Sequence, residues 1–176
     1  MAAPPFPDRL VQLVLIAIII VALLALYFLL KGRPKPAPWQ GHPAGGSYTP
    51  APDGEPVRHW SDGGRFELEV VGESRYRDTI QALAGDHGEG KADARHPALL
   101  LPDDANPYED KAVAVFLSGR MVGYLAPKDA LAFRQMLARH EIDGKPTSTD
   151  AAVRGGGTWE GKRLAYSVWL DVSLTG

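Results

Sequence analysis

The chain has 176 residues, a length that suits one folded domain with appended segments. It contains no cysteine, which excludes a RING or any other zinc module built on cysteine ligands. The formal net charge is −2. Strong sequence-independent nucleic-acid binders are usually basic because they neutralise phosphates, so the charge disfavours extended, tight binding of that kind.

A short polar lead, residues 1–9, precedes an apolar run from Leu10 to Leu30 in which Gln12 is the only strongly polar residue. About 20 apolar residues at a rise of about 1.5 Å cover the ~30 Å hydrocarbon core of a bilayer. The alternative is a cleavable signal peptide, whose apolar region is typically about 7–15 residues long and ends in a small-residue cleavage site. This run is longer and ends at Leu29-Leu30-Lys31. We therefore expect a retained transmembrane helix over 10–30.

The basic residues predict the orientation of this span. Lys31, Arg33 and Lys35 follow it, whereas the lead has Arg9 offset by Asp8. Because basic flanks stay on the cytoplasmic side, we expect a single-pass protein of the inner (plasma) membrane with its C-terminal domain in the cytoplasm.

Residues 31–64 have the composition of a linker. The stretch from Gly32 to Gly64 holds seven prolines and seven glycines among 33 residues and few aliphatic side chains. Such a segment cannot bury enough apolar area to offset the loss of chain entropy, so we expect it to be extended and mobile. Aromatic residues interrupt it. Trp39 suits the membrane interface, and Trp60 could instead dock on the domain; the sequence decides neither.

The folded domain is expected over 65–176. Phe66, Leu68 and Val70 alternate with glutamates, which predicts a half-buried strand. Three further elements follow in chain order: a short helix over Arg77–Ala84 that turns Ile80 and Leu83 inward and stops at Gly85, a polar loop over Asp86–His96, and a strand over Ala98–Leu101, buried on both faces.

Residues 101–125 predict a polar loop followed by a tight hairpin. The loop holds Asp103, Asp104, Asn106, Pro107, Tyr108, Glu109 and Asp110. Two apolar strands, Ala112–Leu117 and Met121–Leu125, flank a Ser118-Gly119-Arg120 turn. Ser-Gly between apolar runs is a hairpin signal because glycine accepts the positive φ of a tight reversal.

The remaining elements complete a small barrel. Pro127 suits a first helical position, and Ala130, Phe133, Met136 and Leu137 give the helix that it opens an apolar face. Residues 149–154 and 164–174 predict a final antiparallel pair, interrupted by three glycines at 155–157. The fold class is mainly β (α+β): a small OB-like barrel with one or two short helices, preceded by a single transmembrane helix.

Four short motifs in this order resemble the HIRAN domain family. They are Val70-Val71-Gly72 at a strand end, Asn106-Pro107-Tyr108 with an acidic residue after it, the strand Ala112–Val115, and the strand Val122–Leu125. The resemblance extends over about Phe66 to Leu174, and it implies a small OB-like barrel that binds single-stranded DNA, especially a free 3′ end.

The resemblance also implies ligand contacts for particular residues. Tyr108 would stack on a base, which is typically worth ~1–3 kcal/mol. Glu109 stands where the family commonly has an aspartate that accepts a hydrogen bond from the terminal 3′-hydroxyl. Arg75 and Tyr76 stand where the family places basic and aromatic contacts, with Arg77 as a further polar group. Tyr124 stands where some members have histidine.

Each of these residues also has a structural alternative. Tyr108 could pack against its own loop, Arg75 could pair with Glu73, and Tyr124 could face the core. Lys128, at the start of the second helix, could contact phosphate or be an ordinary surface lysine. The longer Glu109 side chain shifts the acceptor by about one methylene, which disfavours strict 3′-end recognition.

The net charge of the domain favours a second hypothesis for its function, beside DNA binding. Residues 65–176 carry 14 Lys and Arg against 17 Asp and Glu, a net of −3. This charge and the membrane tether favour a protein partner, so an adaptor that binds a peptide is the second hypothesis. A third is divalent-metal hydrolysis at the acidic loop, since hard cations take oxygen ligands. His87 and His96 are a weaker metal candidate. No Walker loop, GxSxG or HExxH is present, so we expect neither an enzyme nor a cofactor.

Overall fold

The computed structural model describes Leu13 and residues 48–174. The expected transmembrane helix over 10–30 lies, apart from Leu13, outside the described residues, as do Trp39 and the first half of the expected linker. The chain divides into two compact units, Met1–Pro38 and Trp39–Gly176, and the fold below is that of the second. Within the described residues, no helix combines the length and the hydropathy needed to cross a membrane.

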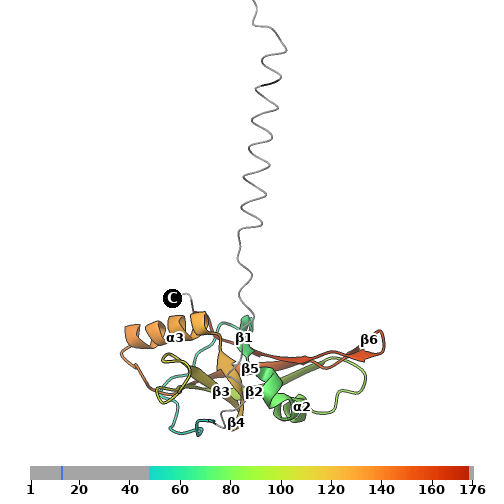
Figure 1. Cartoon of the computed structure of the whole chain (residues 1–176), viewed down its shortest axis with the longest axis horizontal. Helices are drawn as coiled ribbons and strands as arrows, with labels where there is room; N and C mark the ends of the chain where they lie inside the picture. Colours follow the sequence, from blue (N-terminus) through green and yellow to red (C-terminus); the bar gives the residue numbers. More distant parts are fainter. Residues whose placement is uncertain (1–12, 14–47, 175–176) are drawn as a thin grey trace, which may run out of the picture. The chain divides into compact units, whose positions relative to one another are not determined.

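The described part of the second unit is mainly β. Its elements are β1 (Leu68–Val71), the 3-10 helix η1 (Glu73–Tyr76), α2 (Arg77–Ala84), β2 (Ala92–Pro102), β3 (Val113–Leu117), β4 (Arg120–Leu125), α3 (Pro127–Arg139), β5 (Thr147–Gly155), β6 (Thr158–Trp159), β7 (Lys162–Arg163) and β8 (Tyr166–Leu170). Six strands close a barrel in the order β1-β4-β3-β2-β5-β8, with every neighbouring pair antiparallel. The β6–β7 hairpin lies at the end of β5 that is remote from α3 (Figure 1).

Alternate residues of the strands fill the barrel. Val113, Val115 and Leu117 of β3 point inward and are fully buried, together with Val122 of β4 and Leu170 of β8. Successive strand side chains point to opposite faces, so one apolar residue in two is enough to build this core. The expected mainly β barrel is therefore confirmed at the level of a closed barrel with short helices.

Most elements predicted from periodicity are present. The β3–β4 hairpin turns at Ser118 and Gly119, both with positive φ, as the Ser-Gly signal predicted. The helix α2 has the expected bounds and buries Ile80 and Leu83, and α3 begins at Pro127 and buries Phe133. The final pair is β5 with β8.

The strand β2 is longer than the sequence predicts. It begins at Ala92, within the segment 86–96 that we expected to be a loop, and Ala92 pairs with Gly155 of β5. Its inward-facing residues there are small or polar: Ala92 is buried and Ala94 and His96 are half-buried, whereas Asp93 and Arg95 between them are exposed. Because these inward side chains carry little apolar bulk, the backbone hydrogen bonds of the β2–β5 ladder define this part of the strand. Hydrophobic periodicity does not detect such a segment.

Residues 48–64 also differ from the expected mobile linker, because they lie against the barrel. The backbone N–H of Trp60 donates to the carbonyl of Ser148 at 2.8 Å, and the N–H of Ser148 donates to the carbonyl of Arg58 at 2.8 Å. Trp60 is 9 % exposed and belongs to the barrel core. Of the two positions open for Trp60, the domain is the one observed. Arg58 covers its ring at 4.3 Å, and the His140 ring lies at 5.2 Å.

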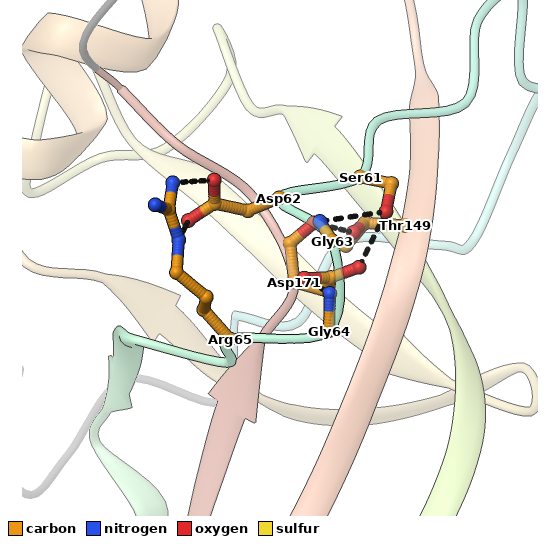
Figure 2. A network of polar contacts seen from close by, with 7 residues as sticks. All are labelled: Ser61, Asp62, Gly63, Gly64, Arg65, Thr149 and Asp171. Carbon is orange, nitrogen blue, oxygen red and sulfur yellow. Dashed lines mark hydrogen bonds and ion pairs between the residues drawn. The ribbon is translucent and has the colours of Figure 1, made fainter.

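A buried carboxylate holds this segment where it enters the barrel. Asp171, 3 % exposed, follows β8, and its two carboxylate oxygens accept hydrogen bonds from Ser61 Oγ at 2.7 Å and from the Gly64 N–H at 2.8 Å (Figure 2). Its backbone carbonyl accepts from Thr149 Oγ1 at 2.8 Å. Burial acts to raise the pKa of Asp171. The hydrogen bonds from Ser61, Gly64 and the backbone of the neighbouring loop residues outweigh burial, so the pKa is lowered.

We predict that Asp171→Asn lowers the free energy of unfolding by about 1.5–3 kcal/mol at neutral pH, because hydrogen bonds to a charged acceptor contribute about that much. Urea unfolding of the full chain measures the change. Asp143→Asn, at an exposed aspartate, is the matched control and should leave stability unchanged. Equal losses in both variants would contradict a specific role for Asp171.

The pH dependence of that difference follows from the lowered pKa of Asp171. A group whose pKa is lower in the folded state stabilises the fold above its unfolded pKa, and this contribution disappears as the pH falls through the folded value. The difference in unfolding free energy between wild type and Asp171→Asn should therefore be constant above about pH 4 and shrink below it. A difference that grows on acidification would contradict the assignment.

Candidate ligand-binding site

A second apolar cluster lies on the outer face of the barrel. It is formed by residues of β3 and β4 that alternate with the core positions, together with the residue before β3: Ala112, Ala114, Phe116, Met121 and Tyr124. Tyr76 of η1 and two leucines of β2 pack against it. Tyr124 faces outward from the barrel interior, and these neighbours leave it only 4 % exposed. Tyr76 lies beside it.

Polar and charged side chains surround the aromatic pair Tyr76 and Tyr124 and shift the pKa of Tyr124. Burial is the leading cause that raises the pKa of Tyr124, and Tyr76, Asp103 and Tyr48 raise it further, whereas Arg75 opposes them. Burial also raises the pKa of Tyr76. Tyr76 packs against the cluster that contains Tyr124, and Tyr48 is bonded to Asp103, so η1, β4, the loop after β2 and the segment before the barrel meet here.

The loop after β2 is fixed by its own polar side chains. Asp103 is 4 % exposed, and its carboxylate accepts from Asn106 Nδ2 at 3.1 Å and from the Tyr48 hydroxyl at 2.7 Å. Asn106 Oδ1 accepts from the Tyr108 N–H at 3.0 Å, as asparagine commonly does in turns. The Asn106-Pro107-Tyr108 motif therefore forms a turn. Tyr108 at this turn is 41 % exposed.

The acidic residues of this loop do not converge. Asp103 is occupied by Tyr48 and Asn106, and Asp104 forms an ion pair with Arg134 of α3. His87 and His96 bond to separate groups, the Gly90 and Leu83 carbonyls among them. Across the part of the chain that the structure describes, no three histidine or carboxylate side chains gather as metal ligands would.

The six residues that the sequence singled out lie in different parts of the domain. Arg75, Tyr76 and Tyr124 lie together. Tyr108 is on the loop that Asp103 organises, and Glu109, beside it, is half-buried with Oε1 accepting from the Lys111 N–H at 3.4 Å. Lys128 is exposed near the start of α3, and among the described residues no hydrogen bond or ion pair joins it to the loop. Arg77 lines a separate pocket, formed by η1, α2 and residues 163–166.

Sequence reasoning missed Tyr48 and the role of Asp103. Tyr48 stood in a segment interpreted as linker, and Asp103 was one of four loop acids with nothing to distinguish it. The only signal in the sequence was the presence of an aromatic residue, Tyr48, within a Pro/Gly-rich segment. Their hydrogen bond raises the pKa of Tyr48 to about 12.

No known family model matches the chain, and no curated protein or solved structure matches it.

We predict that Tyr48 and Asp103 are energetically coupled. Tyr48→Phe should lower the free energy of unfolding by about 1 kcal/mol, since the hydrogen bond is charge-assisted but partly exposed. A double-mutant cycle with Asp103→Asn, measured by urea unfolding, should show non-additivity, whereas Tyr48→Phe combined with Asp110→Asn should be additive. Because the pKa of Tyr48 is raised to about 12, the effect of Tyr48→Phe should be complete below about pH 10 and fade above it. Additivity in both cycles would contradict the coupling.

Proposed function

We propose that this domain is a HIRAN-like module that binds a single-stranded nucleic-acid end, held at the cytoplasmic face of the inner membrane by a transmembrane helix over 10–30. The observation that carries the proposal is the assembly of Arg75, Tyr76 and Tyr124 beside the loop that presents Tyr108. A closed, mainly β barrel is compatible with the OB-like class, which binds nucleic acid with stacking aromatic residues on its surface.

Each side chain has a defined part in the proposed mechanism. Tyr108 is exposed enough to stack on a terminal base. Arg75, exposed on η1, contacts a backbone phosphate, to which guanidinium can bond bidentately. Tyr124 and Tyr76 are largely buried and form the wall against which the nucleotide lies. The Glu109 carboxylate accepts a hydrogen bond from a free 3′-hydroxyl and repels a 3′-phosphate. Lys128 is a secondary phosphate contact.

The charge of the domain limits the extent of this interface. With a net charge of −3 over residues 65–176, few phosphates can be neutralised, so affinity should come from stacking and end recognition more than from counterion release. A weak dependence on salt concentration is therefore part of the proposal.

Binding of short single-stranded oligonucleotides to the full chain tests the proposal. An oligonucleotide ending in a 3′-hydroxyl should bind more tightly than the same sequence with a 3′-phosphate. Tyr108→Ala should weaken binding by ~1–3 kcal/mol, roughly 5- to 150-fold, as expected for loss of one stacked base. Trp159→Ala is the matched control, because Trp159 is also an exposed aromatic residue, 67 % exposed, but lies on the β6–β7 hairpin.

Failure to bind either oligonucleotide at low salt would reject nucleic-acid recognition and favour the second candidate, a peptide-binding adaptor. A specific observation supports that candidate. The barrel already binds an extended segment of its own chain, since Val57 and Trp60 donate backbone hydrogen bonds to the carbonyls of Pro146 and Ser148. A partner peptide would be bound by the same type of main-chain contact.

A further inference from the structure

A cavity of about 500 Å³ lies between the η1–α2 segment and the β7–β8 segment. Glu73, Ser74 and Arg77 line one side, and Arg163 and Tyr166 line the other. The four residues of η1 are therefore divided: Glu73 and Ser74 face this cavity, while Arg75 and Tyr76 belong to the aromatic site described above. Volumes of 300–1,000 Å³ are typical of small-molecule sites.

Two guanidinium groups line the cavity without a carboxylate partner among the described residues. The described ion pairs involve Arg65, Arg95, Arg134 and Arg154, each with an aspartate. Arg163 instead donates to two neutral acceptors, the Gly156 carbonyl and the Tyr166 hydroxyl, both at 3.3 Å. Arg77 is exposed, and the structure gives it no hydrogen bond or ion pair to a described residue. The cavity lining therefore carries two basic side chains and one acidic side chain, Glu73, and Asp78 lines an adjoining pocket with Arg163.

A chain of hydrogen bonds fixes the position of Arg163. His87 Nδ1 lies 2.7 Å from the Gly90 carbonyl, which can only accept, so Nδ1 is the donor of this hydrogen bond. His87 Nε2 forms a second hydrogen bond with the Tyr166 hydroxyl at 2.9 Å, and that hydroxyl oxygen accepts from Arg163 Nη2. The histidine thus holds the tyrosine hydroxyl in place, and the hydroxyl holds the arginine.

The glycine at 156 makes this arrangement sterically feasible. A Cβ there would lie 2.2 Å from Cε1 of Tyr166, and the residue has a φ of +73°. Gly156, in the run of three glycines that interrupts the sequence between the last two predicted strands, therefore allows the Tyr166 ring to lie close against the backbone, where its hydroxyl accepts from Arg163.

Glu73 is the acidic member of the cavity, and its charge is reduced. Its carboxylate accepts the Val168 N–H at 2.6 Å. Burial raises the pKa of Glu73 to about 7, and the nearby Glu69 adds to the rise. Near neutral pH the Glu73 carboxyl is therefore more readily protonated than an ordinary glutamate, so it offers less repulsion to a bound anion.

We propose that this cavity binds a small soluble phosphomonoester, with the phosphate between Arg77 and Arg163 and its organic part against Ile80 and Leu164. Two guanidinium charges match the charge of a phosphate dianion, and each can bond two of its oxygens. Ser74 and Gln81 supply neutral hydrogen bonds at the rim. The aliphatic side chains that complete the lining suit an apolar substituent of modest size.

Titration of the full chain with phenyl phosphate, with phenol as the uncharged counterpart, tests this proposal by calorimetry. Phenyl phosphate should bind and phenol should not. Arg77→Gln and Arg163→Gln should each weaken binding roughly tenfold or more, the loss expected for hydrogen bonds between charged groups. Arg120→Gln is the control, at an exposed arginine at the start of β4.

Further variants distinguish an anion site from a cation-binding pocket. Arg77→Gln removes a side chain that contacts no described residue through hydrogen bonds, so its folding should be intact even if Arg163→Gln unfolds. Glu73→Gln should bind phenyl phosphate at least as tightly as wild type, whereas weaker binding would point to a cation-binding pocket and overturn the proposal.

Equal binding of phenol and phenyl phosphate, no binding of either, or unchanged binding in Arg77→Gln would also overturn it. Tyr108→Ala should retain binding, which keeps the result independent of nucleic-acid recognition.

Discussion

The carboxylate of Asp171 is the contact on which the rest of this domain depends. Asp171 follows β8 directly, at the place where β8 pairs with β1 and closes the barrel. By accepting hydrogen bonds from Ser61 and Gly64, it fixes the path of the chain just before β1 begins. A closed barrel has no free edge strand, so the residues that lead into β1 decide whether the last pairing forms in register. A single satisfied carboxylate thus joins the segment before β1 to the end of β8.

The register of β1 in turn positions both candidate sites. The 3-10 helix η1 follows β1 after one residue, Gly72, which has a φ of +84°. Its first two residues line the basic cavity, and its last residue, Tyr76, packs against the aromatic cluster. Glu73 is also bonded to the backbone of β8, so the turn is tied to the strand that closes the barrel. A shift of this one turn would alter both surfaces together, which makes η1 the natural place for them to influence each other.

The sequence predicted those parts of the fold in which apolar burial follows a strict period. The helices α2 and α3 and the β8 strand each have one apolar face that their periodicity predicted, and the β3–β4 hairpin was predicted from two apolar runs around a Ser-Gly turn. The first half of β2 alternates in burial, but its inward residues are alanines and a histidine with little apolar signal, and residues 48–64 are held by backbone hydrogen bonds and single polar side chains. The same reason explains the sites. Tyr108 was visible as an aromatic residue in a turn motif, but the pairing of Tyr48 with Asp103, and of Arg77 with Arg163, joins residues far apart in the sequence.

The attachment of residues 48–64 changes where the independent folding unit begins. Composition placed the start of the domain at Arg65, yet Trp60 fills part of the core, Ser61 satisfies a buried carboxylate, and Tyr48 reaches the loop after β2. A fragment cut at Arg65 would remove Trp60 from the core and leave the backbone groups of Pro146 and Ser148 without their hydrogen bonds to residues 57–60. Limited proteolysis, sequence comparison between relatives and the choice of a truncation point should all place the boundary before Tyr48, inside the proline-rich stretch and not at its end.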